Sequence, residues 1–476
     1  MTAPSGNQEG IRPQETVERA LAAARCDDCV VIADETSSAN LRWAGNTLTT
    51  NGNSRSRQLT VIAISRSAEG TRAGVVSRAG VRDDQVGDVV QAAEQAATQG
   101  PPADDAQPLP APAGPDTAGP AGGPVWDDPV DRTEIGIFGA FSAALGGAFD
   151  AAGSAGQRLY GFAQHSVTST FLGTSSGLRL RHTQPAGTVE INAKSADLAR
   201  SAWTGQGTRD FSDVNVSVLH ADLSRRLDWA SRRVDLPAGR YQTLLPPAAA
   251  ADLLIYLYWS AGAKDALDGR TAFSKPGGGT RIGDRLSGLP LTLRSDPAAA
   301  GLGCARFVLA HASSRESSVF DNGLALRPTE WISGGNLAGL IQTRHTAALS
   351  GLPVTPTIGN LILDGGGTAT LDDMIARTGR GLLLTCLWYI REVDPQTLLL
   401  TGLTRDGIYL VENGEVTGAV NNFRFNESPV GMLARTSEAG LTGPALSREW
   451  GDYFSRTAMP PLRVDGFNMS SVSPAS

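Results

Sequence analysis

Cysteine is scarce in this sequence: there are four among 476 residues, at Cys26, Cys29, Cys304 and Cys386. So few cysteines exclude the disulfide framework that holds small secreted domains together. Cys26 and Cys29 form a single C-x-x-C, whereas a structural zinc site would need a second pair or two histidines at matching spacing. We interpret this C-x-x-C as the junction between a helix and the strand that follows, with a redox pair as the alternative.

Histidine is equally scarce, and no two of the five histidines lie four residues apart. The zinc-binding H-E-x-x-H is therefore absent. His311, His345 and Cys386 remain weak candidates for a metal site that distant parts of the chain would assemble. Residues 173–177 match the G-x-S-x-G of serine hydrolases, but that motif requires a helix after the serine. Because the sequence after Ser175 indicates a strand, we interpret the motif as a hairpin turn.

Long runs of basic or apolar residues are also missing. The chain has 41 basic and 48 acidic residues, a formal net charge of −7, which disfavours nucleic acid or an anionic membrane as the main partner. No stretch approaches the roughly 18 continuous apolar residues of a membrane span. Residues 1–15 are polar and lack the apolar core of a signal peptide. We therefore expect a cytoplasmic protein.

The length indicates two domains rather than one core. Helical periodicity alternates with strand-like segments in the first half, whereas short strands and glycine turns dominate after about residue 285. Residues 101–124 are rich in proline and glycine, which indicates an exposed loop. We predict an α+β fold, in which a domain of helices and a strand meander precedes a mainly antiparallel β domain with few helices. The predicted units are an N-terminal domain over 13–235, a C-terminal domain over 236–460 and a tail over 461–476, with helices over 13–25, 83–100, 133–152 and 213–232, and strands over 30–34, 41–52, 57–66, 71–80, 157–171, 177–183 and 187–193.

Residues 252–268 (DLLIYLYWSAGAKDALD) contain seven consecutive large apolar residues, Leu253 to Trp259, followed by small ones. The pattern predicts a buried helix over 253–263. No histidine, cysteine or glutamate occurs in this segment, and its first charged residue after Asp252 is Lys264. The residues alone therefore indicate a two-domain globular protein without an assembled catalytic set.

Three stretches together resemble the TldD/PmbA family. They are residues 31–64 (VIADETSSANLRWAGNTLTTNGNSRSRQLTVIAI), residues 159–182 (LYGFAQHSVTSTFLGTSSGLRLRH) and residues 381–429 (GLLLTCLWYIREVDPQTLLLTGLTRDGIYLVENGEVTGAVNNFRFNESP). Their order and spacing carry the resemblance, which covers residues 13–455. It implies one of the paired subunits of a bacterial metallopeptidase that degrades unfolded peptides and trims leader peptides. The TldD-type subunit carries H-E-x-x-x-H and a later cysteine as zinc ligands, and the PmbA (TldE)-type subunit keeps the fold without that site.

The helix over 253–263 falls where the zinc helix of the family falls. Zinc binding there needs two histidines on one helix face and a glutamate that polarises the zinc-bound water. Facing pairs in this chain, Ile255 with Trp259 and Tyr256 with Ser260, cannot bind zinc. The resemblance therefore implies the TldE-type subunit, with no catalytic, cofactor-binding or metal-binding residue of its own. We interpret the helix as a scaffold that replaces the metal helix with core.

The expected partners are a TldD-type catalytic subunit, which would hold the zinc in a heterodimer, and an extended peptide substrate. One alternative is a stand-alone peptide-binding or assembly module. Another is an independent hydrolase that uses Cys386, Ser175 or scattered histidines. The sequence identifies neither the peptide nor the interface residues, and it leaves general proteolysis and natural-product biosynthesis both open.

Overall fold

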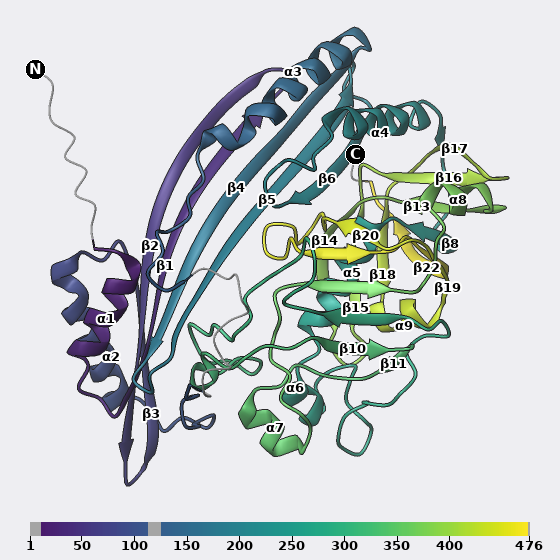
Figure 1. Cartoon of the computed structure of the whole chain (residues 1–476). Helices are drawn as coiled ribbons and strands as arrows, with labels where there is room; N and C mark the ends of the chain where they lie inside the picture. Colours follow the sequence, from purple (N-terminus) through teal and green to yellow (C-terminus); the bar gives the residue numbers. More distant parts are fainter. Residues whose placement is uncertain (1–10, 113–124, 475–476) are drawn as a thin grey trace, which may run out of the picture.

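The computed structural model describes residues 11–112 and 125–474. A long, curved sheet forms the N-terminal part and lies beside a β-rich C-terminal part (Figure 1). Helices cover the long sheet, and antiparallel pairs dominate all three sheets. The predicted α+β class, with a strand meander followed by a mainly antiparallel β domain, is confirmed.

Six antiparallel strands build the N-terminal sheet in the order β3-β2-β1-β4-β5-β6. Along β1 the odd-numbered residues from Val31 to Trp43 are buried, because successive side chains point to opposite faces. Only residues 29–33 are buried on both faces. The strands are β1 (Asp28–Trp43), β2 (Leu48–Ser67), β3 (Gly70–Ala79), β4 (Gln157–Thr174), β5 (Arg179–Ser195) and β6 (Ser201–Thr208).

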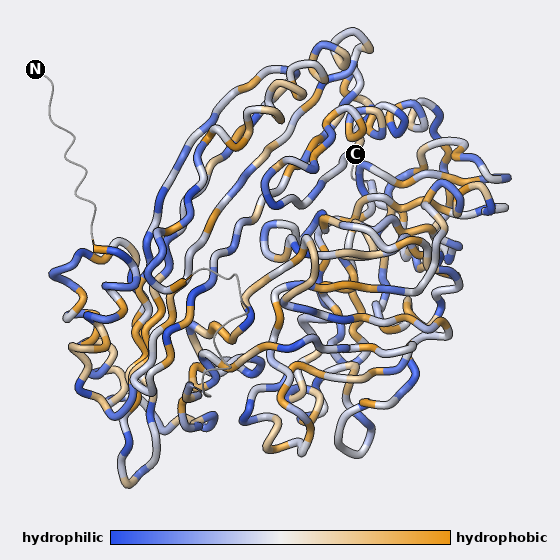
Figure 2. Tube along the Cα trace, viewed as in Figure 1, coloured by the Kyte–Doolittle hydropathy of each residue, from blue (hydrophilic) through white to orange (hydrophobic). Residues whose placement is uncertain are grey.

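The helices cover the odd-numbered face of β1. At one end of the sheet, Val17 and Val89 of two helices pack on Val31, and Figure 2 shows the strand ends there as mainly hydrophobic. At the other end, Phe141 and Leu223 belong to a second core with strand residues of β1, β4 and β5. The first pair of helices is α1 (Pro13–Ala23) and α2 (Val86–Gln99, after the 3-10 turn Asp83–Gln85), and the second is α3 (Gly139–Ser154, after the 3-10 turn Ile135–Phe138) and α4 (Val216–Trp229).

In the C-terminal part, a ten-stranded sheet and a six-stranded sheet enclose the largest core. Strand order is β14-β15-β18-β22-β8-β13-β16-β17-β7 in the first, with β19 on β22, and β11-β10-β9-β12-β21-β20 in the second. The strands are β7 (Arg233–Val234), β8 (Gly239–Leu245), β9 (Thr292–Ser295), β10 (Thr329–Ser333), β11 (Asn336–Leu337), β12 (Leu361–Asp364), β13 (Arg380–Leu384), β14 (Leu387–Asp394), β15 (Leu399–Thr404), β16 (Ile408–Glu412), β17 (Glu415–Val420), β18 (Phe423–Glu427), β19 (Thr436–Ala439), β20 (Gly443–Ala445), β21 (Thr457–Met459) and β22 (Leu462–Val472). The helices are α5 (Pro247–Trp259), α6 (Ala263–Leu267), α7 (Arg344–Ser350), α8 (Leu371–Ala376) and α9 (Pro429–Ala434), and η4 (Val319–Asp321) is a 3-10 turn.

Two expectations about the C-terminal part need correction. Residues 461–476, predicted as a tail, contain β22, which pairs with β8, β18 and β19 inside the ten-stranded sheet. Residues 233–234, assigned to the N-terminal domain, form β7, which pairs with β17 of the same sheet. Both corrections arise from long-range strand pairing, which the local sequence does not encode.

The N-terminal predictions differ from the structure in three places. Strands expected over 177–183 and 187–193 form one continuous strand, β5. The strand expected over 41–52 is interrupted by a turn at residues 44–47, and its last residues belong to β2, which continues through the strand expected over 57–66. Residues 101–112 form the expected loop without helix or strand, but Leu109 is half-buried against the sheet; residues 113–124 lie outside the described residues.

One helical stretch in the described part, Ile135–Ser154, is long and apolar enough to cross a membrane by length and composition alone. This corrects the expectation that no segment approaches the length and hydropathy of a membrane span. A single such helix is weak evidence for a span, because the core helix of a soluble protein can have the same composition. Here Phe138, Phe141 and Leu145 are buried in the core that the stretch shares with the N-terminal sheet.

Candidate functional site

Helix α5 occupies the core between the two C-terminal sheets. Proline in its first turn and the alanines that follow favour a helix starting at Pro247. It packs against β8, β20, β21 and α9. The predicted buried helix is confirmed, although it begins six residues earlier than expected and ends at Trp259, before Ala261.

The side chains that replace the zinc motif on α5 pack in the core or cap the end of the helix. Ile255 is fully buried. The rings of Tyr256 and Trp259 lie 5.8 and 5.3 Å from the ring of Trp450, measured between centroids. The Ser260 hydroxyl donates to the Tyr256 carbonyl at 2.9 Å. None of these four positions offers an atom that coordinates zinc well, so this helix face acts as core.

Asp252 is the one carboxylic acid of α5, and no sequence pattern marked it as a candidate. Its side chain is fully buried. Oδ1 accepts hydrogen bonds from the Ser447 hydroxyl and, at 2.9 Å, from the Glu449 N–H, whereas Oδ2 has no partner among the described residues. Burial raises the pKa of Asp252 to about 7, against the lowering effect of the Ser447 hydrogen bond.

The structure does not bring the weak metal candidates together. His311 lies at the N-terminal sheet, with Nδ1 3.1 Å from the Thr60 hydroxyl. His345 is half-buried on α7. Cys386 is fully buried between β13 and β14, and this burial raises the pKa of its thiol. Within residues 11–112 and 125–474, no group of three or more histidine, cysteine, aspartate or glutamate side chains could hold a metal ion.

The G-x-S-x-G segment lies in the hairpin turn between β4 and β5, as predicted. The Ser175 hydroxyl donates to Asp28 Oδ1 and accepts the Cys29 N–H, both at 3.0 Å, so it ties the turn to β1. Cys26 lies just before β1 and Cys29 within it, which confirms the predicted junction. A hydrogen bond between the two thiols lowers the pKa of Cys26 and raises that of Cys29.

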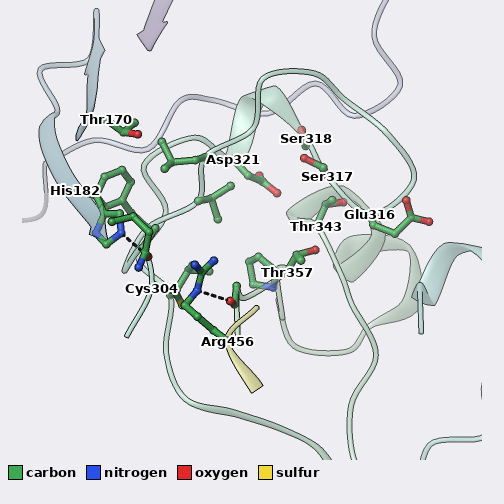
Figure 3. Close-up of a pocket in the computed structure, with 18 of the residues that line it drawn as sticks. Thr170, His182, Cys304, Glu316, Ser317, Ser318, Asp321, Thr343, Thr357 and Arg456 are labelled. Atoms are coloured by element: carbon green, nitrogen blue, oxygen red, sulfur yellow. Dashed lines mark hydrogen bonds between the residues drawn. The ribbon is translucent and has the colours of Figure 1, made fainter. Parts of the chain in front are cut away.

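A cavity of about 370 Å³ lies between the N-terminal sheet and the C-terminal loops, and sequence reasoning missed it. Figure 3 shows His182 from β5 on one side, Arg456 below and Glu316 on the opposite side. His182 Nε2 lies 3.1 Å from Gln184 Oε1, and Arg456 Nε donates to the Gly359 carbonyl at 3.0 Å. No local signal marks this site, because its residues are spread from position 168 to position 456.

Burial and positive charge shape the electrostatics of this cavity. Burial lowers the pKa of His182, and the guanidinium groups of Arg456 and Arg306 lower it further. Burial also lowers the pKa of Arg456. Asp321, which also lines the cavity, is neutralised by Arg344, whose Nε donates to Oδ1 at 2.6 Å. The region around Arg456 and His182 is therefore short of negative charge.

One comparison with known proteins assigns part of the chain to a family. The family model of the PmbA/TldA metallopeptidase C-terminal domain matches residues 238–471. A comparison with curated protein sequences finds no match.

Solved structures share the fold over almost the whole chain. TldE from Thermococcus kodakarensis has a TM-score of 0.76 at 14% identity, covering 96% of this chain and 99% of that chain. A putative modulator of a DNA gyrase from Thermotoga maritima has a TM-score of 0.73 at 13% identity, covering 96% of this chain and 99% of that chain. A putative modulator of DNA gyrase from Bacteroides thetaiotaomicron has a TM-score of 0.73 at 14% identity, covering 97% of this chain and 98% of that chain. Residues 238–471 therefore belong to the PmbA/TldA metallopeptidase C-terminal domain family, and the whole chain shares the fold of the solved TldE structure.

Proposed function

We propose that the chain is the non-catalytic, TldE-type subunit of a zinc metallopeptidase, in which a TldD-type partner holds the metal. The observation that carries this proposal is helix α5. It lies in the core of a domain that matches the metallopeptidase family, yet its exposed and half-exposed residues are aromatic or small. Zinc does not fit this helix, and we assign no step of peptide hydrolysis to the residues of this chain.

The other candidate groups of the chain also support a non-catalytic role. The Asp252 carboxylate accepts two hydrogen bonds through Oδ1, and its high pKa favours the neutral acid, which is a poor zinc ligand. The raised pKa of Cys386 disfavours the thiolate that zinc requires. A catalytic role for Ser175 would need a base, whereas its hydroxyl donates to Asp28 within a turn.

The substrate in this proposal is an unfolded peptide or a leader peptide in extended form. Pairing of such a peptide with the edge of a sheet satisfies its main-chain hydrogen bonds and selects little for side chains. This subunit would then complete the fold around a site in the partner, and zinc would belong to the partner alone.

The test begins with the isolated full-length chain, stripped of metal, re-equilibrated with zinc and dialysed. We expect elemental analysis to find almost no zinc per chain and no peptidase activity. After mixing with a TldD-type protein, we expect a stoichiometric heterodimer by solution mass and cleavage of an unfolded peptide. Stoichiometric zinc that survives dialysis would contradict the proposal and direct attention to His311, His345 and Cys386. A homodimer that binds no TldD-type protein would favour the stand-alone binding module.

A further inference from the structure

The guanidinium group of Arg456 faces the cavity without an acidic partner. Its Nε donates to the Gly359 carbonyl, and its two terminal nitrogens have no hydrogen-bond partner within the part of the chain that the structure describes. They are not buried, so the cavity leaves them open to a ligand. No ion pair joins Arg456 to any described carboxylate, and burial lowers its pKa. A half-buried cation of this kind is costly unless an anion or ordered water meets it.

Three other arginines that are buried or partly buried have acidic partners. Arg344 donates to Asp321 at 2.6 Å, and Arg448 donates to Glu190 at 2.8 Å. Arg463 Nε donates to Glu438 at 2.9 Å. Arg456 is thus set apart from these three by its open terminal nitrogens.

Glu316 gives the opposite side of the cavity a negative charge. Its Oε2 accepts the Ser314 hydroxyl at 3.1 Å, and no cation among the described residues forms an ion pair with it. Between Glu316 and Arg456 the lining carries the hydroxyl groups of Thr343 and Thr357 (Figure 3). The cavity therefore has an open cation on one side, an open anion on the other, and hydrogen-bonding groups between them.

We propose that this cavity binds a short peptide with its C-terminal carboxylate on Arg456 and its amino group toward Glu316. A guanidinium group presents two parallel N–H donors that match the two oxygens of a carboxylate. The positive charge of Arg306 acts in the same direction. A volume of about 370 Å³ suits a small ligand. The inference rests on the residues of the cavity and does not require the proposed partner subunit.

The test uses the full-length chain and the dipeptide L-alanyl-L-alanine in isothermal titration calorimetry, with concentrations up to about 10 mM. We expect saturable binding, at least about tenfold weaker binding of the C-terminal amide, and weaker binding of the N-acetyl form. Equal binding of the dipeptide and its amide would overturn the proposal. So would the absence of dipeptide binding, or acetate that binds as tightly as the dipeptide, because that would reduce the site to a simple anion site.

Variants locate the site and keep a folding failure from being mistaken for a loss of binding. Arg456→Gln should weaken dipeptide binding at least about tenfold, and Arg456→Lys should retain part of it, since the charge remains without the two-pronged geometry. Glu316→Gln should weaken binding of the dipeptide and leave binding of the N-acetyl form unchanged. Arg327→Gln, which removes an exposed charge outside the cavity, is the matched control and should bind normally. Normal binding by a folded Arg456→Gln chain would place the ligand elsewhere.

Discussion

At the residue scale, Asp252 makes the stability of the fold depend on pH. Its pKa in the folded state is about 7, against an ordinary value of 3.8, because burial disfavours the charged form. Between these values the folded state keeps a proton that the unfolded chain releases. The contribution of Asp252 to stability is therefore greatest below about pH 4, falls as the pH rises, and levels off above about pH 7.

Asp252→Asn should remove this dependence. At pH 8 we expect the free energy of unfolding to rise by roughly 1–3 kcal/mol, since about 1.4 kcal/mol per pKa unit is offset by the weaker hydrogen bonds that a neutral amide accepts from Ser447 and Glu449. Urea unfolding at pH 4, 6 and 8 measures the effect. Asp452→Asn, at an exposed carboxylate, is the control and should leave the curve unchanged. A variant as pH-dependent as the parent chain would show that Asp252 is ionised in the folded state.

Helix α5 shows which features of single residues could be predicted from the sequence and which could not. The absence of histidine and glutamate from α5 can be read from the sequence, because it needs no coordinates. The environment of Asp252 could not be predicted, because Ser447 and Glu449 lie almost 200 positions away in the sequence. The cavity around Arg456 was missed for the same reason.

At the element scale, α5 is a structural scaffold held by aromatic contacts. Tyr256→Ala combined with Trp259→Ala should lower the free energy of unfolding by roughly 2–4 kcal/mol, because both rings lose their packing on Trp450. Zinc content should not change. Tyr453→Ala, at a side chain 80% exposed, is the matched control and should shift stability by no more than about 0.5 kcal/mol. A change in zinc bound per chain would refute the scaffold role.

Helices were easier to predict than the long strands. Periodicity located α1, α2, α3 and α4, since one face of each packs on the sheet. In β1 only residues 29–33 are buried on both faces, where Phe307 and Phe320 cover the even-numbered side. That stretch alone gives a continuous apolar run, so the sequence indicated a short strand where the structure has sixteen residues. Strand length here is set by pairing with β2 and β4.

At the scale of the whole molecule, a well-packed charged contact is one of those that join the N-terminal and C-terminal parts. Arg448 donates to Glu190 on β5 at 2.8 Å, and Trp203 on β6 donates to the same oxygen at 2.9 Å. The guanidinium group stacks over Trp203 and Trp388, at 5.1 and 3.8 Å from their ring centroids. A second contact, between Arg225 on α4 and Asp372 on α8, is more exposed. The sequence predicted two units but gave no basis for placing this joint.

Arg448→Ala should separate the unfolding of the two parts. The substitution leaves Glu190 without a cation and removes the stacking on both tryptophans, so we expect about 2–4 kcal/mol lower stability and a broadened or split transition in differential scanning calorimetry. Arg225→Ala is the matched control across the same joint. Its ion pair is solvent-exposed, so it should cost less than about 1 kcal/mol and leave a single transition. Equal effects of the two substitutions would mean that the joint is held by apolar packing, such as the contact of Phe307 and Phe320 with β1, rather than by Arg448.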